Sequence, residues 1–256
     1  MKLSVVRYAT ETLAKVLKLA GALLIVLFFS ISPIIANPFD QKVSLVVIDA
    51  GHGGHDPGAV ANGIMEKNLV LKVCQKLARM LEEDGMKVVM TRTDDVFLEL
   101  EARCAVANSQ VWPDGGSAIF ISVHANSSSI EDANGYEVFS AYDDNPVDFL
   151  NESTPSVQGF RFAAIASNEA SRLCAQKSNL LSERIVSSIS SRLPEMRSRG
   201  AKEADLYVLN CSAMPSVLVE IGFLSNPDES RMMKSDSFQI RMAQAIKDGI
   251  EDYSGK

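Results

Sequence analysis

The 256-residue chain contains three histidines, and two of them stand where strands are expected to end. His52 follows the apolar run 43–49, and His124 ends the apolar run 117–123. Because sites in open α/β sheets form beyond the carboxyl ends of the strands, both imidazoles are expected at one edge of a sheet. Two histidines with a carboxylate are a common ligand set of catalytic zinc. The spacing therefore predicts a metal site that includes His52 and His124.

The other histidine and the nearest carboxylate are weaker candidates on position alone. His55 lies three residues after His52 in a glycine-rich loop that has no helical register to align the two rings, so we interpret it as a polar surface residue. Glu66 opens a predicted helix, where a carboxylate is expected in any case because it complements the helix dipole. Its position alone makes Glu66 a weak candidate ligand.

Glu220 is harder to explain as a structural residue. It lies in the apolar run 217–223, with apolar neighbours on both sides. A carboxylate in a buried strand is costly unless it is paired or close to a cation. An edge strand with Glu220 facing water would need an alternation of apolar and polar residues, which this run lacks. We therefore interpret Glu220 as functional, a general base next to a metal.

The elements that must position these residues alternate along the chain. Apolar runs predict strands at 43–49, 86–93, 117–124, 136–141, 206–210 and 217–223. Helical spacing predicts helices at 66–84, 98–109, 160–193 and 235–253. This alternation predicts an α/β fold: a single domain with a mostly parallel, twisted sheet and helices on both faces.

Composition limits the class of protein. With 46% hydrophobic and 22% charged residues the chain is typical of a globular protein, which excludes a fully disordered one. The formal net charge of -7 argues against nucleic acid as a partner.

Residues 1–36 predict a secretory signal peptide. They combine a basic start, an apolar core and a small residue at the end, with cleavage expected after Ala36. An uncleaved anchor is the alternative, although Ser30, Ser32 and Pro33 interrupt the apolar run. We therefore expect an exported protein of the periplasm or cell envelope, a monomer with no stable membrane insertion once the signal is cleaved.

The cysteines leave two states open. Cys74, Cys104, Cys174 and Cys211 include no CxxC pair, which argues against a cysteine-rich metal site. Export permits disulfides, whereas the helical patterns around Cys74 and Cys104 suit buried free thiols equally well.

Four sequence blocks occur in one order: DAGHGGHDPGA at 49–59, Glu66 at a helix start, SVHAN at 122–126 and MPSVLVEIGFLSN at 214–226. Together they resemble the zinc-dependent N-acetylmuramoyl-L-alanine amidases, which are bacterial cell-wall hydrolases, from about residue 43 to 253. The resemblance implies that His52, Glu66 and His124 bind Zn²⁺ and that Glu220 is the catalytic carboxylate. It gives His55 no role.

The resemblance also implies an activity. Residues 37–256 would form a catalytic domain that hydrolyses the amide bond between N-acetylmuramic acid and L-alanine in peptidoglycan, for cell-wall remodelling or daughter-cell separation. Two other functions stay open: a non-catalytic wall-binding protein on the same fold, and a different zinc hydrolase such as a carboxypeptidase acting on the stem peptide.

Three polar residues near these blocks have expected supporting roles. Asp49 and Asp56 are expected to fix the loop by accepting hydrogen bonds from backbone amides. Asn126 is expected to orient His124 or to contact substrate.

A possible regulatory insertion spans about 143–179. Periodicity is lost over 142–159 and a long helical region follows. Some periplasmic division amidases carry an inserted helix that covers the zinc until a protein activator displaces it. The resemblance therefore extends to a hypothetical cover, in which Glu152 or Glu169 would occupy the open zinc position. An ordinary surface insertion, with its helix packed on the sheet, is the alternative.

Overall fold

A computed structural model of the chain describes residues 42–111, 116–130, 132–142 and 158–255, and for 158–169 it describes the backbone only. These described residues form one compact unit. The expected signal peptide, 1–36, lies outside the described residues. Within the described ranges, no helix has the length and apolar character that a membrane span requires.

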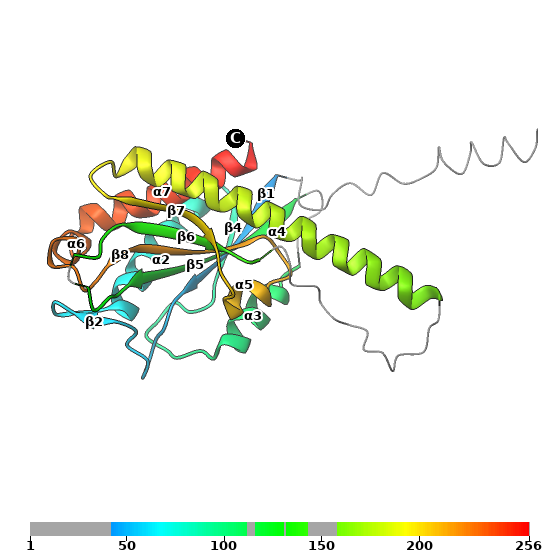
Figure 1. The fold of residues 1–256 in the computed structure, drawn as a ribbon, viewed down its shortest axis with the longest axis horizontal. Coiled ribbons are helices and arrows are strands. Elements are labelled where there is room, and N and C mark those ends of the chain that lie inside the picture. Colours follow the sequence, from blue (N-terminus) through cyan, green and yellow to red (C-terminus); the bar gives the residue numbers. More distant parts are fainter. Residues whose placement is uncertain (1–41, 112–115, 131, 143–157, 256) are drawn as a thin grey trace, which may run out of the picture. The chain divides into compact units, whose positions relative to one another are not determined.

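A six-stranded sheet forms the centre of the domain, in the order β4–β1–β5–β8–β6–β7 (Figure 1). Four strands are parallel: β4 (Lys87–Met90), β1 (Val43–Ala50), β5 (Ser117–Asn126) and β8 (Ser216–Phe223). β6 (Tyr136–Ser140) is antiparallel to β8, and β7 (Ser198–Glu203) is parallel to β6. The predicted α/β domain with a mostly parallel sheet is confirmed.

Three long helices cover one face of this sheet: α2 (Glu66–Glu83), α4 (Gln158–Arg192) and α7 (Asp236–Ser254). Their apolar residues form the larger core with the strands. α4 and α7 approach closely at Gly249, where an added Cβ would lie 2.6 Å from the Cα of Ile185. A short helix, α6 (Pro227–Met233), follows β8, and β2 (Val60–Ala61) and β3 (Ile64–Met65) form a separate hairpin.

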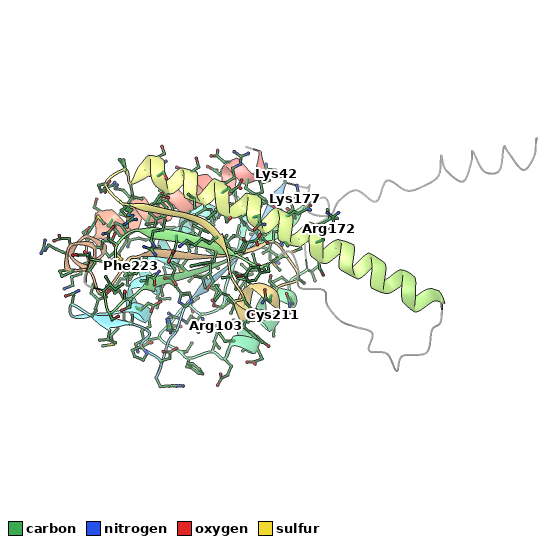
Figure 2. The ribbon with its side chains drawn as sticks, viewed as in Figure 1. Lys42, Arg103, Arg172, Lys177, Cys211 and Phe223 are labelled. Atoms are coloured by element: carbon green, nitrogen blue, oxygen red, sulfur yellow. A yellow bond between two sulfur atoms is a disulfide. The ribbon has the colours of Figure 1, made fainter. Side chains whose placement is uncertain are left out.

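Two short helices cover only part of the other face: α3 (Leu100–Asn108) and α5 (Tyr207–Asn210). They close the smaller core, which includes Phe120 and Leu218. A disulfide joins Cys104 in α3 to Cys211 at the end of α5, and Figure 2 labels Cys211 there. Cys74 and Cys174 are free thiols. Because α3 and α5 are short, the carboxyl ends of the strands stay open on this face.

The prediction of a strand at 206–210 is wrong. Tyr207–Asn210 is one helical turn, in which Asn210 N donates to the carbonyl oxygen of Leu206 at 3.0 Å. A short apolar run does not distinguish a strand from a helix turn by periodicity. The strand in this region is β7, whose polar sequence gave no strand signal.

The predicted insertion at 143–179 divides into two parts. Residues 143–157, with Glu152, and the side chain of Glu169 lie outside the described residues. Further along α4, Ala175 is buried, Ser178 Oγ accepts a hydrogen bond from Ser216 N at 2.9 Å, and Asn179 contacts Ser140. Residues 175–179 therefore belong to a helix packed on the sheet, and the cover formed by Glu152 or Glu169 stays a prediction.

Candidate active site

His52, Glu66 and His124 converge at the carboxyl ends of β1 and β5, where their potential ligand atoms all lie within 4.8 Å of one another. Glu66 stands between the imidazoles: its Oε2 lies 3.1 Å from His52 Nε2 and its Oε1 lies 2.9 Å from His124 Nδ1. The two rings meet edge to face with their centroids 4.9 Å apart. The carboxylate is buried and both imidazoles are partly exposed, so the group faces solvent on one side.

Glycines in the loop after β1 make this convergence possible. A Cβ at Gly51 would lie 2.3 Å from the ring of His124, and one at Gly58 would lie 2.6 Å from Glu66 Oε2. His52 itself adopts the left-handed region, with φ of 60°. The loop is therefore packed directly against the three side chains and leaves no room for larger residues at these two glycines.

A buried ion pair, Arg103 with Asp49, anchors this loop. Arg103, on α3, donates through Nη2 to the carbonyl oxygen of His52 and through Nη1 to Asp49 Oδ1, both at 2.8 Å. The expectation that Asp49 accepts from backbone amides is wrong: the bonds of its carboxylate are to side chains, the hydroxyls of Thr91 and Ser122 besides Arg103. Asp49 lies within the buried strand β1, one residue before its end, so its nearest donors come from neighbouring elements rather than from the loop that follows.

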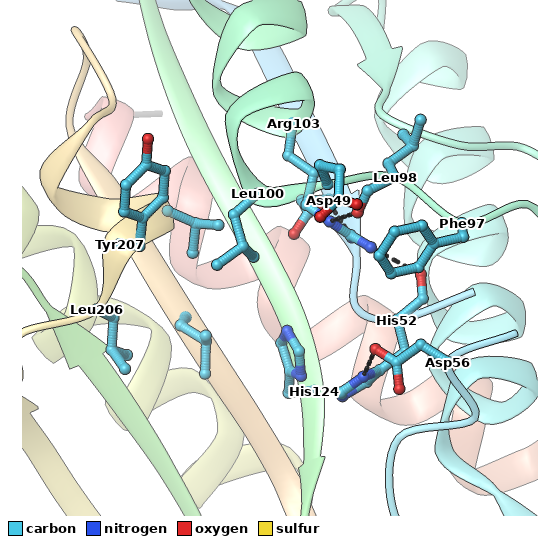
Figure 3. A pocket seen from close by; sticks show the side chains of 13 residues that line it. Asp49, His52, Asp56, Phe97, Leu98, Leu100, Arg103, His124, Leu206 and Tyr207 are labelled. Carbon is cyan, nitrogen blue, oxygen red and sulfur yellow. Dashed lines mark hydrogen bonds and ion pairs between the residues drawn. The ribbon is translucent and has the colours of Figure 1, made fainter. Parts of the chain in front are cut away.

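Asp56 does accept from a backbone amide, as predicted: Gly58 N donates to its Oδ1 at 3.0 Å. Its other oxygen lies 2.7 Å from His52 Nδ1, a contact that was not predicted (Figure 3). A carboxylate on Nδ1 fixes the tautomer and leaves Nε2 free to bind a cation, as in many zinc sites.

The charges of the group also fit a cation. Burial opposes a charge on His52, but the hydrogen bonds and charges of Glu66 and Asp56 outweigh it and raise the pKa of His52 to about 9. Burial likewise favours a neutral Glu66, yet hydrogen bonds from His124 and His52 hold the pKa of this carboxyl well below its usual range. The ionised Glu66 thus attracts positive charge, and two imidazoles with a carboxylate are a suitable donor set for zinc.

Glu220 lies on β8 directly opposite His124 on β5. Its Oε2 is shielded from solvent and has no hydrogen-bond partner among the described residues. Burial, and to a smaller extent the charges of Glu66 and Glu137, raises the pKa of Glu220 to about 7. A carboxylate with a pKa near neutrality, and with an oxygen free to accept a proton, is suited to general base catalysis.

Sequence reasoning missed a charged cluster next to Glu220. Glu137 on β6 accepts from Asn126 Nδ2 at 2.6 Å and from Arg199 Nε at 3.1 Å, and Lys202 Nζ contacts the same oxygen as Arg199. Asn126 is therefore bonded to this carboxylate. Glu137 carried the same signal as Glu220, an acid within an apolar strand, whereas the polar stretch of Arg199 and Lys202 is marked only by its fit to the layout of the family that the sequence resembles.

A pocket of about 360 Å³ adjoins the metal-binding group. His52 and His124 stand at one end of it, and Figure 3 shows Leu100 and Arg103 of α3 facing Leu206 and Tyr207 across it. Leu218, two residues before Glu220 on β8, also lines the pocket. Apolar walls beside polar catalytic candidates are typical of a ligand site. His55 lies outside the group of three and packs against Phe97, with 4.1 Å between ring centroids.

A family model described as N-acetylmuramoyl-L-alanine amidase matches residues 46–252. Among curated proteins, YqiI of Bacillus subtilis is 35% identical over 85% of this chain and 87% of its own length. The endolysin of Bacillus phage SPP1 is 34% identical over 81% of this chain, and the amidase AmiC of Neisseria meningitidis is 30% identical over 82% of it. This chain covers 65% of that endolysin and 52% of that AmiC.

Solved structures have the same fold. The amidase AmiC2 of Nostoc punctiforme is 32% identical with a TM-score of 0.63, over 83% of this chain and 97% of that one. The CwlD amidase of Clostridioides difficile, solved in complex with the GerS lipoprotein, is 25% identical with a TM-score of 0.63, over 82% of this chain and 98% of that one.

Proposed function

This chain belongs to the N-acetylmuramoyl-L-alanine amidase family, hydrolases that act on peptidoglycan, and from that premise we propose that it cleaves the amide bond between N-acetylmuramic acid and L-alanine with Zn²⁺ as its cofactor. One observation carries the proposal: His52, Glu66 and His124 bring their ligand atoms within 4.8 Å of one another, next to Glu220. A cation site beside a free carboxylate supports hydrolysis of an amide.

Zinc would be held by His52, Glu66 and His124. When bound, Zn²⁺ supplies a Lewis acid that polarises the amide carbonyl and lowers the pKa of water. Asp56 keeps the ring of His52 oriented through Nδ1, and Glu66 fixes His124 at 2.9 Å. Arg103 holds the loop that carries His52.

Glu220 would move the proton that hydrolysis requires. Its Oε2 accepts the proton from the attacking water, and the same carboxyl then donates it to the leaving nitrogen of L-alanine. The free Oε2 supports this role because no hydrogen bond within the described residues has to be broken first. The products are a glycan strand with a free lactyl carboxylate and a peptide with a free amino terminus.

The setting of this reaction would be the cell envelope, in wall remodelling or daughter-cell separation. The disulfide between Cys104 and Cys211 supports export, since such bonds persist in oxidising compartments. A protein partner also remains a proposal, supported by the solved complex of the CwlD amidase with the GerS lipoprotein.

Digestion of purified peptidoglycan by the zinc-loaded protein tests the proposal. Mass spectrometry should find sugar-free stem peptides that begin with a free L-alanine amine. Glu220→Gln should keep stoichiometric zinc and lose about 10²- to 10⁴-fold in turnover, the usual contribution of a general base. Release of single C-terminal residues would favour a carboxypeptidase, and a protein that binds no zinc and releases nothing would favour a wall-binding role.

A further inference from the structure

Polar side chains occupy paired positions on four neighbouring strands, β5, β8, β6 and β7, and those on β7 are cationic. His124 on β5 is opposite Glu220 on β8, which in turn is opposite Glu137 on β6. On the next strand, β7, Ser198 pairs with Tyr136 and Ala201 pairs with Val138, so Glu137 lies beside Arg199 and Gly200. Directly opposed residues project from the same face of a sheet. The metal-binding group and Arg199 therefore flank Glu220 on the open face.

A bulge in β7 brings two cations to this set of side chains. Between the paired positions β7 advances from 198 to 201 while β6 advances only from 136 to 138, so one extra residue is inserted. Gly200 takes a φ of +84°, and a Cβ there would meet nothing within 4 Å, so its backbone conformation alone calls for glycine. In a regular strand residues three apart face opposite sides, but the bulge turns Arg199 and Lys202 toward one carboxylate.

The cluster has an unbalanced charge. Arg199 and Lys202 both contact Oε2 of Glu137, so two positive charges meet one negative charge. Burial favours a neutral Glu137, but Lys202 and Arg199 hold its pKa below the usual range, so the carboxylate is ionised. Glu203, the next residue along, is held by Asn179 of α4 at 2.8 Å. Within this contact, two cations thus share one carboxylate, and Arg199 also acts electrostatically on Glu229.

Both cations are held in place yet accessible. The guanidinium of Arg199 stacks over Phe223, 5.1 Å from the ring centroid, at the end of β8. Lys202 Nζ lies 5.8 Å from the ring centroid of Phe139. The side chain of Arg199 is 32% exposed and that of Lys202 is 39% exposed, whereas Glu137 is 6% exposed. A ligand can thus reach the cations but not the carboxylate beneath them.

We propose that Arg199 and Lys202 form a specificity-determining subsite that binds a carboxylate of the stem peptide, that of an acidic residue directly following L-alanine. The inference rests on the proposed function. The lactyl carboxyl of the sugar is consumed in the scissile amide, so the free carboxylates near that bond belong to the peptide. Strand spacing puts Glu137 about 5 Å from Glu220, and the residue after L-alanine carries its carboxylate about 7 Å from the scissile nitrogen at the rise of an extended chain.

The test compares two substrates that differ only in this charge: GlcNAc-MurNAc-L-Ala-D-isoglutamate and the same compound ending in D-isoglutamine, with the zinc-loaded protein. The wild type should show a kcat/KM about 10- to 100-fold higher for the acid, the size of one charge-assisted hydrogen bond. Lys202→Met should remove most of this preference by lowering kcat/KM for the acid far more than kcat/KM for the amide.

Two variants control for folding and for overall charge. Lys202→Arg keeps the cation and should keep the preference, which separates lost charge from a damaged strand. Lys87→Met removes an exposed lysine from β4, the strand at the opposite edge of the sheet, and should change neither rate. Equal kcat/KM for acid and amide in the wild type, or an undiminished preference in Lys202→Met, would overturn the subsite. Failure to cleave either compound or intact peptidoglycan would instead contradict the proposed function, and the subsite with it.

Discussion

Arg103 and His52 are joined by a hydrogen bond of 2.8 Å from the guanidinium to the backbone carbonyl, although they belong to different elements 51 residues apart. The same guanidinium pairs with Asp49, and both side chains are almost fully buried. α3 therefore does two things: it lines the pocket beside the site and it holds the loop that carries a metal-binding imidazole.

Replacing Arg103 should test this coupling. Arg103→Met leaves Asp49 buried without its counter-charge, so we expect a loss of about 3–5 kcal/mol in the free energy of unfolding, measured by urea denaturation. Arg103→Lys keeps the charge but has no planar fork of donors, and should lose less. Arg231→Met is the control, because Arg231 pairs with Asp228 on the exposed surface of α6 and should cost less than about 1 kcal/mol. A loss as small as this control in Arg103→Met would show that the loop does not depend on α3.

Gly58 and Gly85 form a matched pair for testing how closely the loop packs against the metal-binding group. Both have left-handed backbones, with φ of +62° and +79°. A Cβ at Gly58 would meet Glu66 and His52 at 2.6 Å, whereas one at Gly85 would meet nothing within 4 Å. Both alanine variants should lose about 1–2 kcal/mol of stability from backbone strain, but only Gly58→Ala should also bind zinc at least tenfold more weakly, as measured by competition with a chelator. Equal zinc affinities would contradict the packing argument.

Features that depend on a local sequence pattern could be predicted, whereas contacts that depend on the pairing of two strands could not. The strand 217–223 and the interpretation of Glu220 followed from an apolar run that a carboxylate interrupts, a local signal of burial. Arg199 and Lys202 had no such signal, because one inserted residue at Gly200 decides which side chains share a face. Register is a property of two strands together, and residue spacing within one strand does not contain it.

Glu66 shows the same limit in the metal-binding group. Its position at a helix start has an ordinary explanation, and only the resemblance to a family pointed to a ligand. Its carboxylate meets both imidazoles because the loop at Gly58 and the strand end at His124 close around it. The prediction of a strand at 206–210 was wrong for a related reason. These residues form a helical turn that packs over Leu218, and the apolar run does not contain this contact.

The cross-link between Cys104 and Cys211 should stabilise the fold in oxidising conditions. It closes a loop of 107 residues, for which restriction of the unfolded chain corresponds to about 4–5 kcal/mol, with about 2–5 kcal/mol typical of measured removals. The double variant Cys104→Ser/Cys211→Ser should unfold at a lower temperature than the wild type and be insensitive to reductant. Cys174→Ser, which removes a free thiol, should keep the response of the wild type to reductant. A wild-type unfolding temperature that reductant leaves unchanged would argue against the bridge.

Zinc uptake should be linked to the release of a proton from His52. In the metal-free protein the pKa of His52 is raised to about 9, so at pH 7 the imidazole carries a proton that a bound cation must displace. The Kd for zinc should therefore fall about tenfold per pH unit between pH 7 and 9 and level off above that. Titration calorimetry at pH 7, in two buffers of different ionisation enthalpy, should find about one proton released per zinc.

The raised pKa of His52 also makes the free energy of unfolding of the metal-free protein depend on pH. A raised pKa means that the folded state holds the proton more tightly than the unfolded chain, so this contribution is complete below about pH 6.5 and is lost as pH rises through 9. Asp56→Asn removes one of the two carboxylates that raise the pKa of His52. In that variant fewer protons should be released at pH 7, and the decline in stability should still begin near pH 6.5 but be smaller and end at a lower pH than in the wild type. Zinc uptake without proton release in the wild type would mean that His52 is already neutral before zinc binds. Glu66 and Asp56 would then not raise the pKa of His52 as proposed.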